Sequence, residues 1–453
     1  MDFIVCKFGG SSVATTEKIA HIATILDQNP KRRAVVVSAP GKAAGVSVKV
    51  TDLLITLATK SYKNEDCEQE KRALKTRFKE IYEPLGVAAA IVDKALTELD
   101  RRMAKPFEDP KKYRDLLAAL GEDLNAQLFA EYLTFTGRPA RYVSPKEAGL
   151  VVTPVFGDAQ PLPDVALRLA GLKKMCSEQI IVFPGFFGIT PDGDIATFSR
   201  GGSDLTGSIV AEALEAVEYE NFTDVNGIFS AHPHIVKNPV QIEALSYKEM
   251  RELSYIGFNV LHEEAVKPVL RKKIPIRLRN TDNLANSGTL IVSERLPSER
   301  DVVGIASGSG YCSFTLQKFL MNREKGFGRK LLSIIEEMGF TYEHCPSGVD
   351  NISVILDQTQ LKSEDVNNMI RIIEEQLNPD EIKTEFGIAM VAVVGEGLIH
   401  KIGVLAQAAS ALSKAGVNIK MANQGSSEIS IIFGIDSSDE AKAVNALYGE
   451  FFG

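Results

Sequence analysis

Residues Ile195 to Leu214 read IATFSRGGSDLTGSIVAEAL and contain a complete strand–turn–helix unit. A β-rich run comes first, two glycines follow, and the next apolar residues recur at helical spacing. The residues on the expected helix face are Ile209, Val210, Ala213, Leu214 and Val217. Ser203 is a candidate N-cap residue, with Asp204 in the first turn. A glycine turn that opens a helix offers free backbone N–H groups, so this unit predicts an anion site.

The arginine before the two glycines adds a second way to hold an anion. The guanidinium of Arg200 is a planar fork of donors that matches a carboxylate, and Gly201 and Gly202 let the backbone approach a ligand closely. The same three residues are equally consistent with a tight strand-to-helix turn that carries a surface arginine. The turn alone therefore leaves both interpretations open.

A second glycine turn stands near the N-terminus, where residues 7–12 read KFGGSS at the end of the β-rich run IVCKF. A lysine beside a Gly-Gly turn is a candidate phosphate cradle, although the spacing of the P-loop nucleotide motif is absent. In open α/β sheets, ligands bind beyond the carboxyl ends of the strands. Two such turns in one domain therefore predict two anionic ligands that meet at one edge of the sheet.

The first two-thirds of the chain alternates β-rich runs with helical segments. The β-rich runs are IVCKF, AVVVSA, ARYVS, IIVFPGF, IATFS, YENFTDV and IPIRLRN. Residues 51–133 differ because they are rich in helical signals and charge, and they predict a helical excursion from the sheet. The alternation predicts an α/β domain over residues 1–296, with helices on both faces of a mostly parallel sheet.

An internal repeat follows a linker-like Leu-Pro-Ser at residues 296–298. The stretches 339–356 and 416–433 align without a gap at an offset of 77 residues, and the helical patterns before them align as well. The matched helix faces are Leu331, Ile334, Ile335 and Met338 against Leu405, Ala408, Ala409 and Leu412. Each expected helix ends at a glycine, Gly339 or Gly416. We expect two small α+β units, residues 297–380 and 381–453, between which strands are exchanged.

Composition narrows the function classes. The chain has 453 residues, a formal net charge of −8 and 45% hydrophobic residues, which is typical of a globular protein and does not favour nucleic-acid binding. No apolar run is long enough to span a membrane, and the N-terminus does not have the pattern of a signal peptide. Five scattered cysteines predict free thiols and a cytoplasmic location. His232 and His234 have no further Cys or His cluster beside them, so we predict no metal site there.

Four stretches together resemble a known family: KFGGSS at residues 7–12, SRGGSD at 199–204, FTDVNGIFSAHP at 222–233 and NQGSSEISI at 423–431. These motifs are similar to those of aspartate kinases, which join an amino-acid-kinase fold, a three-layer αβα sandwich, to tandem ferredoxin-like ACT domains. The resemblance covers essentially the whole chain and is greatest to monofunctional, lysine-sensitive enzymes. It implies transfer of the γ-phosphoryl group of ATP to L-aspartate, giving 4-phospho-L-aspartate in the biosynthesis of lysine, threonine and methionine.

The resemblance also implies roles for individual residues. Lys7 would neutralise the transferring phosphoryl group, and Asp204 would orient Lys7 or the reacting groups. The expected substrate-binding residues are Ser38, Thr51, Glu122, Arg200, Gly201, Gly202 and Ser203. The expected ATP-binding residues are Lys7, Gly9, Gly10, Ser11, Thr223, Asp224, Phe229, His234 and Asn259. The expected effector-binding residues are Met321, Phe340, Glu343, Ser347, Gly348, Asn423 and Gln424. The last four are expected on the turns before the final strands, where backbone groups can bind a zwitterion or simply form the turns.

Mg²⁺ is expected with ATP, held mainly by phosphates and water, and we predict no protein ligand for it. The ACT units imply an amino-acid effector, for which lysine is the hypothesis, and a homodimer or homotetramer. Three nucleotide-site positions depart from the family pattern. Phe229 stands where an aromatic hydroxyl is common, His234 where a basic residue is common, and Asn259 where a lysine is common.

Some residues also have simpler interpretations. Glu122 is equally a solvated helix charge, the glycine-rich loop at residues 38–52 is equally a flexible connection rather than a lid, and Glu343 is equally an exposed strand charge. Two rival functions remain. One is another kinase of the same fold, such as a glutamate kinase, and the other is a non-catalytic amino-acid sensor that has lost turnover.

Overall fold

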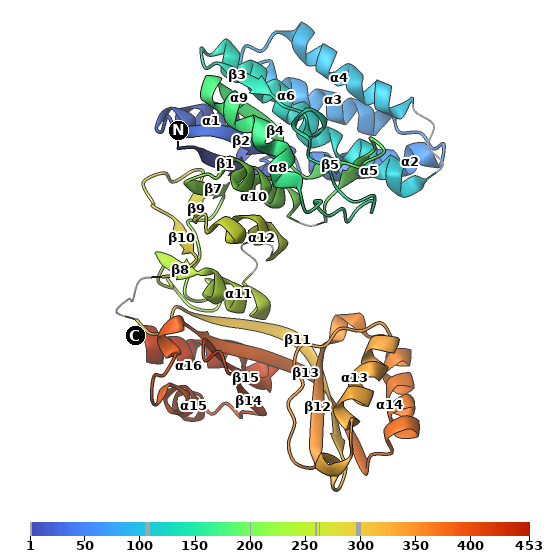
Figure 1. Cartoon of the computed structure of the whole chain (residues 1–453), viewed down its shortest axis with the longest axis vertical. Coiled ribbons are helices and arrows are strands. Elements are labelled where there is room, and N and C mark those ends of the chain that lie inside the picture. Colours follow the sequence, from blue (N-terminus) through green and yellow to red (C-terminus); the bar gives the residue numbers. More distant parts are fainter. Residues whose placement is uncertain (1, 105–108, 200, 259–260, 262, 296–299) are drawn as a thin grey trace. The chain divides into compact units, whose positions relative to one another are not determined.

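The computed structural model describes residues 2–104, 109–199, 201–258, 261, 263–295 and 300–453. The chain divides into two compact units. The first comprises residues 1–228, 243–247 and 259–295, and the second comprises residues 229–242, 248–258 and 296–453. Each unit has its own sheet (Figure 1).

The first unit is built on an eight-stranded sheet with the order β3-β4-β2-β1-β7-β9-β10-β8. Its strands are β1 (Ile4–Phe8), β2 (Arg32–Val37), β3 (Ala140–Tyr142), β4 (Ile180–Pro184), β7 (Glu218–Thr223), β8 (Ala244–Ser246), β9 (Ile276–Asn280) and β10 (Thr289–Val292). All neighbouring strands are parallel except β9 and β10. The predicted α/β class with a mostly parallel sheet is therefore confirmed.

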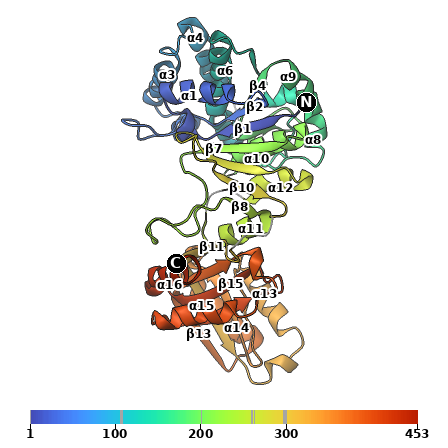
Figure 2. The ribbon, with the colours of Figure 1, turned by 90° about the vertical axis from the view of Figure 1, so that its left-hand side faces the viewer.

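The central strands are buried on both faces, as expected for a parallel sheet between helical layers. Every residue of β1 is buried. Figure 2 shows α1 (Thr16–Asp27) and α10 (Gly202–Leu214) on opposite sides of this strand. Because successive side chains in a strand point to opposite faces, neighbouring residues of β1 and β7 contact different helical layers.

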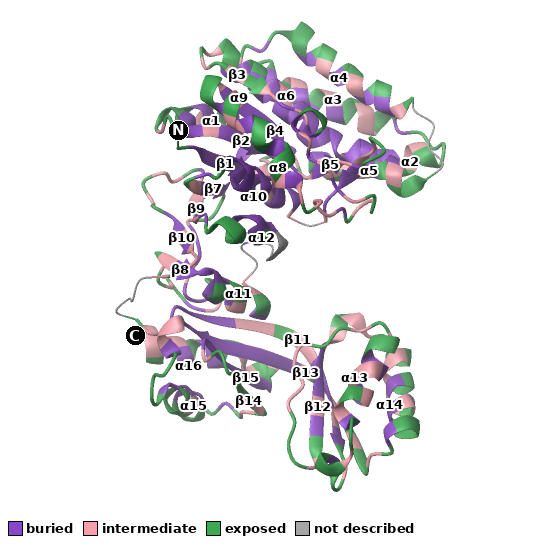
Figure 3. Ribbon diagram, in the orientation of Figure 1, coloured by how far each residue is buried: buried purple, intermediate pink, exposed green. Residues whose placement is uncertain are grey.

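The expected helical excursion consists of five helices, α2 (Val50–Tyr62), α3 (Glu68–Tyr82), α4 (Ala89–Met103), α5 (Pro110–Ala118) and α6 (Leu120–Phe135). Their apolar residues share one buried cluster with α1 and with one face of β1 and β2. The first unit also contains α7 (Pro145–Ala148), α8 (Val165–Arg168), α9 (Leu172–Glu178), α12 (Glu263–Lys272) and the hairpin of β5 (Phe187–Ile189) and β6 (Ile195–Thr197). Helix α11 (Tyr247–Ile256) belongs to the second unit except for its first residue. In Figure 3 the helix α10 is buried along most of its length. It ends at Leu214, so the prediction that Val217 lies on its buried face is wrong, and Val217 is exposed.

The second unit contains a five-stranded antiparallel sheet with the order β12-β11-β13-β15-β14. Its strands are β11 (Gly304–Gln317), β12 (Asn351–Asp357), β13 (Glu381–Val394), β14 (Met421–Gln424) and β15 (Ser430–Asp436), and its further helices are α13 (Phe327–Glu337), α14 (Ser363–Leu377), α15 (Val404–Lys414) and α16 (Glu440–Phe452). The two long strands pair along their whole length, from Gly304 opposite Val394 to Gln317 opposite Glu381. The long strands β11 and β13 therefore form the centre of the sheet, with β12 beside β11 and β15 beside β13.

The repeat seen in the sequence is a structural repeat. Helix α13 spans residues 327–337 and α15 spans residues 404–414, so their bounds differ by the 77 residues of the sequence offset. Both helices end as predicted, at a glycine with positive φ, because Gly339 has φ 80° and Gly416 has φ 67°. The buried face predicted for α15 is wrong at one position, because Leu405 is 42% exposed and its neighbour Val404 is buried instead.

Three further features concern the sequence expectations. All five cysteines are free thiols. No helix in the described part of the chain is long and apolar enough to cross a membrane. Among the described residues, no group of three or more His, Cys, Asp or Glu side chains is arranged to hold a metal ion.

Candidate active site

Lys7 and Asp204 form an ion pair inside the first unit. Lys7 is the fourth residue of β1 and is only 8% exposed. Its Nζ lies 2.6 Å from Oδ1 of Asp204, in the first turn of α10. Asn221 of β7, the direct neighbour of Lys7 in the sheet, donates from Nδ2 to the same carboxylate oxygen at 2.9 Å and accepts from Lys7 at 3.4 Å. The two chain segments that the motifs singled out therefore meet across β1 and α10.

The start of α10 differs from the predicted cap. The N-cap residue is Gly201, which has φ 74° in the left-handed region, and no side chain caps the helix, so the prediction that Ser203 is the N-cap is wrong. Glycine adopts this φ without the steric cost that a Cβ would impose. A Cβ on Gly202 would lie 2.8 Å from the Phe186 ring and 2.9 Å from Cβ of Phe198. Close packing therefore explains the second glycine of the motif.

The N-terminal glycine turn lies against the loop that follows β2. Gly9 donates its N–H to the Phe222 carbonyl at 3.2 Å, and a 3₁₀ turn, Gly10–Val13, follows. The Gly41 N–H donates to the Gly10 carbonyl at 2.9 Å, and a Cβ on Gly41 would meet the Gly10 carbonyl carbon at 2.8 Å. The two backbones are thus closer than larger residues would permit.

A cavity of about 470 Å³ opens beside this contact. It is lined by Gly10, Ser11, Ser38, Ala39, Pro40, Gly41, Lys42, Lys49, Thr51, Glu122 and Asp224. The lining combines residues that the sequence assigned to phosphate, to aspartate and to nucleotide. These residues come from the carboxyl ends of β1, β2 and β7, where ligands of open α/β sheets bind, and from the helices α2 and α6.

Glu122 is the unusual charge in this cavity. Glu122 is 4% exposed, and its Oε2 is buried without a hydrogen-bond partner. Burial raises the pKa of Glu122 to about 8, against the opposing effect of a hydrogen bond from the Ala39 backbone. A buried carboxylate with one unsatisfied oxygen is costly unless a partner arrives, and an ammonium group is the partner that this chemistry favours. The sequence interpretation of Glu122 as a solvated helix charge is therefore wrong.

The stretch after β7 occupies the same edge of the sheet. Thr223 is the last residue of β7, and its hydroxyl donates to Oδ1 of Asp224 at 3.2 Å. The Thr223 carbonyl accepts the backbone N–H of Thr281 at 2.9 Å. The Thr281 hydroxyl lies 2.6 Å from that of Ser12 in the glycine turn. Asp224 therefore borders the cavity from a segment that is fixed to the turn.

Other predicted site residues lie elsewhere. Arg200 and Asn259 lie outside the described residues. Phe229 and His234 belong to the second compact unit. Among the substrate-binding candidates, Ser38, Thr51 and Glu122 line the cavity, whereas Gly201, Gly202 and Ser203 form the start of α10.

The effector candidates all lie in the second unit. Met321 is buried, and Phe340 packs against the apolar cluster of α13 and α14. The Glu343 carbonyl accepts a hydrogen bond from the Tyr255 hydroxyl at 2.7 Å. Ser347 forms an isolated bridge with Ile352, and the Gly348 N–H donates to the Asn351 carbonyl at 2.8 Å.

Asn423 and Gln424 were expected in a turn, but they belong to the edge strand β14, where they pair with Ile432 and Ile431 of β15. The turn expectation is therefore wrong for these two residues. The 77-residue offset relates residues 421–424 to residues 344–347, which include two isolated bridges to β12. The two copies thus place equivalent segments at the two edges of the five-stranded sheet.

Sequence reasoning missed Asn221, Lys42 and Lys49. Asn221 is 3% exposed and connects Lys7 to Asp204, but a single asparagine in a β-rich run forms no pattern. The two lysines lie in the glycine-rich loop and line the cavity. Their positive charge in a glycine-rich segment before a helix was the available signal for an anion site.

Comparisons with known proteins agree with this geometry. The model of the amino acid kinase family matches residues 2–280, and that of the ACT domain matches residues 391–451. Aspartokinase 3 of Bacillus subtilis is 47% identical over 448 residues, which cover 99% of this chain and 98% of that protein. The chloroplastic aspartokinase 1 of Arabidopsis thaliana is 28% identical over 459 residues, which cover 99% of this chain and 80% of that protein.

Solved structures give the same result. The crystal structure of Clostridium acetobutylicum aspartate kinase superposes with a TM-score of 0.89 at 36% identity, covering 99% of this chain and 100% of that one. E. coli aspartokinase III in complex with aspartate and ADP superposes with a TM-score of 0.77 at 24% identity, and both chains are covered completely. At that lower identity the likeness concerns the fold.

Proposed function

Because the chain belongs to the amino acid kinase family and is an aspartate kinase with ACT domains, we propose that the cavity beside Gly10 and Glu122 is where its two substrates meet. The enzyme is an ATP:L-aspartate 4-phosphotransferase. The observation that carries the proposal is the buried Glu122 carboxylate with an unpartnered oxygen, in the same cavity as the glycine turn. An ammonium site and a phosphate site in one cavity are what this reaction needs.

The protein does not need to form a covalent bond or transfer a proton in this reaction. An oxygen of the aspartate side chain attacks the γ-phosphorus of ATP, the bond from that phosphorus to the β–γ bridging oxygen breaks, and ADP leaves with the electron pair. A carboxylate is already ionised near neutral pH, so no general base is required. Catalysis then consists of positioning the two molecules and neutralising the charge on the phosphoryl oxygens.

Lys7 is the proposed source of that neutralisation. Its ammonium lies on β1, one residue before the strand ends and the glycine turn begins. Asp204 and Asn221 fix the position of Nζ, and the backbone N–H groups of Gly9, Gly10 and Ser11 are the proposed donors to phosphate oxygens. Asp204 is therefore assigned the role of orienting Lys7, not that of a base.

Glu122 and its neighbours in the cavity are the proposed binding site for the substrate aspartate. Glu122 would pair with the substrate ammonium, and the hydroxyls of Ser38 and Thr51 line the same space. Arg200 is proposed to clamp a substrate carboxylate, as its motif implies, with Gly201, Gly202 and Ser203 shaping that turn. Two lysines of the neighbouring loop, Lys42 and Lys49, add positive charge to the wall.

The nucleotide side is assigned to Thr223 and Asp224, with Phe229, His234 and Asn259 as further proposed contacts. Mg²⁺ is proposed to accompany ATP. Besides Glu122, which is assigned to the ammonium, the cavity lining holds the carboxylate of Asp224, and no cluster of three ligands is found among the described residues. This donor set fits a cation that keeps its phosphate and water ligands, and the ion would supply charge neutralisation at the phosphates.

The second unit is proposed to regulate the enzyme by binding lysine. The paired ACT units, here residues 297–380 and 381–453, present two equivalent sheet edges, and Glu343 lies near one of them as a partner for a lysine ammonium. We propose assembly into a homodimer or homotetramer through these units, and a cytoplasmic location consistent with five free thiols.

A coupled assay of ADP release across a panel of amino acids tests the proposal. We expect turnover with L-aspartate and none with L-glutamate, and a product that reacts with hydroxylamine as an acyl phosphate does. Turnover with glutamate instead would support the rival glutamate kinase, and no turnover with any amino acid would support a sensor. Repeating the assay with lysine and with threonine tests regulation, and an unchanged rate and KM would remove the lysine proposal.

A further inference from the structure

Arg77 is a buried cation in the helical excursion that no motif singled out. It lies on α3 and is 9% exposed. Its Nη2 donates to two backbone carbonyls, that of Ala14 and, at 3.5 Å, that of Gly41. These residues are distant in sequence from Arg77 and from each other, so one guanidinium joins three segments of the chain.

The two carbonyls belong to the two loops that line the cavity. Ala14 ends the 3₁₀ turn Gly10–Val13, and a cation is the favoured partner for the free carbonyls at such an end. Gly41 belongs to the loop after β2 and donates its own N–H to Gly10. Arg77 and this hydrogen bond therefore fix the spacing between the two loops from different sides.

The charge of Arg77 has no compensating carboxylate. Arg32 and Arg102, two other buried arginines of this unit, form ion pairs with the buried carboxylates of Glu220 and Asp123. For Arg77, no ion pair is found among the described residues, and its Nε is buried without a partner. Burial lowers the pKa of Arg77, and only Glu80 opposes that effect electrostatically. An unpaired buried charge is costly to the fold, so its retention calls for a function.

The surrounding contacts show that the helical excursion supports the cavity as a whole. Thr16, at the start of α1, donates to the carbonyls of Glu80 and Ile81 at 3.1 Å each, which ties the end of α3 to the segment after the glycine turn. Asn125 of α6 donates to the Ser38 carbonyl at 2.7 Å and accepts from the Tyr82 hydroxyl. Arg77 is the one charged member of this set of supports.

We propose that Arg77 is a positioning residue for phosphoryl transfer, which holds the glycine turn and the loop at Gly41 at the separation that the two substrates require. The inference rests on the proposed location of the active site. The uncompensated positive charge is also bonded to the end of the 3₁₀ turn that follows the glycines, where it favours anionic ligands. Arg77 does not touch the substrates, and acts through the carbonyls of Ala14 and Gly41.

The test compares Arg77→Met, Arg77→Lys and Leu74→Ala. Leu74 lies on the same helix, is fully buried and belongs to the apolar cluster, so its truncation removes packing while leaving the hydrogen bonds of Arg77 to Ala14 and Gly41 in place. We expect Arg77→Met to lower kcat/KM by about 10- to 100-fold, since small displacements of a reacting group have effects of that size. Arg77→Lys restores a cation with several donors and should recover most of the loss. Leu74→Ala should stay within about twofold of wild type, although its melting temperature falls.

Gly41→Ala provides a second route that leaves Arg77 in place. A methyl group at Gly41 would press on the Gly10 carbonyl and should give the same loss in kcat/KM. The inference is overturned if Arg77→Met keeps kcat/KM within twofold of wild type. It is also overturned if Arg77→Lys has the melting temperature of wild type but a kcat/KM no higher than that of Arg77→Met. Wild-type activity of Gly41→Ala would also overturn it.

Lys7→Ala is measured in parallel, because its activity tests the location of the active site itself. An inactive Lys7→Ala together with a normal Arg77→Met refutes only the role of Arg77.

Discussion

Two buried charge clusters lie back to back on the same two strands of the first unit. Lys7 and Asn221, which are neighbours across β1 and β7, point toward α10 and meet Asp204. Cys6 and Glu220, each one residue earlier, are likewise neighbours and point to the opposite face. One step along each strand thus separates the proposed catalytic cluster from a second cluster with different properties.

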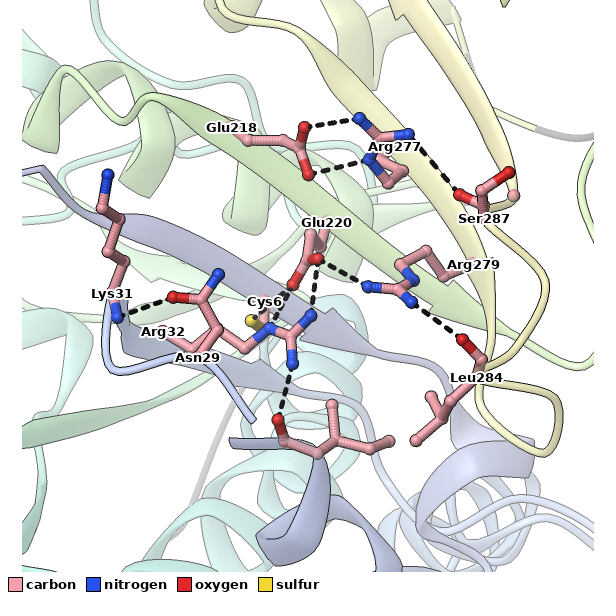
Figure 4. Close-up of polar contacts among 12 residues, drawn as sticks. Cys6, Asn29, Lys31, Arg32, Glu218, Glu220, Arg277, Arg279, Leu284 and Ser287 are labelled. Atoms are coloured by element: carbon pink, nitrogen blue, oxygen red, sulfur yellow. Dashed lines mark hydrogen bonds and ion pairs between the residues drawn. The ribbon is translucent and has the colours of Figure 1, made fainter. Parts of the chain in front are cut away.

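In the second cluster, both oxygens of the buried carboxylate are paired. Both oxygens of Glu220 bind Arg32, from its Nε at 2.6 Å and its Nη2 at 2.8 Å, and Arg279 adds a bond at 3.2 Å (Figure 4). Nη1 of Arg32 donates to the Ile25 carbonyl and Nη2 of Arg279 to the Leu284 carbonyl, while Nε of Arg279 is buried without a partner. Burial acts to raise the pKa of Glu220, but the bonds to the two arginines outweigh burial and leave the pKa below its ordinary value.

The catalytic cluster is open by contrast. Lys7 uses two donors on Asp204 and Asn221, and no third partner is found among the described residues. Glu122, in the cavity, has an unpartnered oxygen, and burial raises its pKa to about 8. The comparison teaches that a carboxylate with both oxygens paired stabilises the sheet, whereas a buried carboxylate with an unpartnered oxygen beside the strand ends is available to ligands.

The largest effect should come from Lys7→Ala. Removal of the only charged group of β1 that faces α10 should lower kcat by about a thousandfold or more, since charge neutralisation dominates phosphoryl transfer. The melting temperature should change by only a few degrees. Turnover and thermal unfolding of the same preparation check the prediction, and a kcat near that of wild type would contradict the assignment of Lys7.

Glu220→Gln should produce the reverse pattern. Two arginines would lose their shared carboxylate inside the sheet, which we expect to cost about 3–5 kcal/mol in the free energy of unfolding. The folded variant should keep a kcat within a few-fold of wild type. Because the pKa of Glu220 is depressed in the folded state, its contribution is present above the ordinary value of 4.5 and is lost as the pH falls below it. Denaturant titrations at pH 7 and pH 4 measure this difference, and a variant as stable as wild type at pH 7 would refute the contrast between the clusters.

Glu122→Gln should stabilise the free enzyme while weakening substrate binding. Since the pKa of Glu122 is raised from 4.5 to about 8 in the folded state, the unfolded chain ionises first, and wild type loses stability as the pH rises through that window. Relative to wild type, the glutamine variant should gain roughly 3–5 kcal/mol by pH 8 and nothing below pH 4.5.

The same substitution has a kinetic signature. The wild-type KM for aspartate should fall as the pH approaches 8, because binding of the ammonium requires the ionised carboxylate, and Glu122→Gln should raise this KM and abolish its pH dependence. Initial rates at several pH values measure it. A pH-independent wild-type KM would show that Glu122 does not pair with the ammonium.

Asn221→Ala should have the smallest effect. Asp204 would still hold Lys7, but the ammonium would lose one of its two fixed partners, so we expect kcat to fall about tenfold with KM for both substrates little changed. Asn221→Asp is a useful companion, because it retains the acceptor and adds a charge. An unaltered kcat in Asn221→Ala would show that the ion pair alone positions Lys7.

The sequence was informative where local chemistry decides the structure. The glycine turns, the strand ends and the repeated helices with their terminal glycines follow from backbone preferences and hydrophobic spacing. The pairing of Lys7 with Asn221 depends on the register of two strands that are distant in sequence, so no local pattern could reveal it. The cap at Gly201 was missed because a left-handed glycine and a serine cap leave similar sequence signals. The contacts of Arg77 depend on the packing of α3 against two loops, which periodicity does not predict.

A crystal structure with ADP and L-aspartate bound to the wild-type enzyme tests the central claim most directly. We predict the β-phosphate at the glycine turn, within reach of Lys7 Nζ and the N–H groups of Gly10 and Ser11, and the aspartate ammonium on the free oxygen of Glu122. Density for either molecule away from these groups, with Lys7 still bound only to Asp204 and Asn221, would contradict the account.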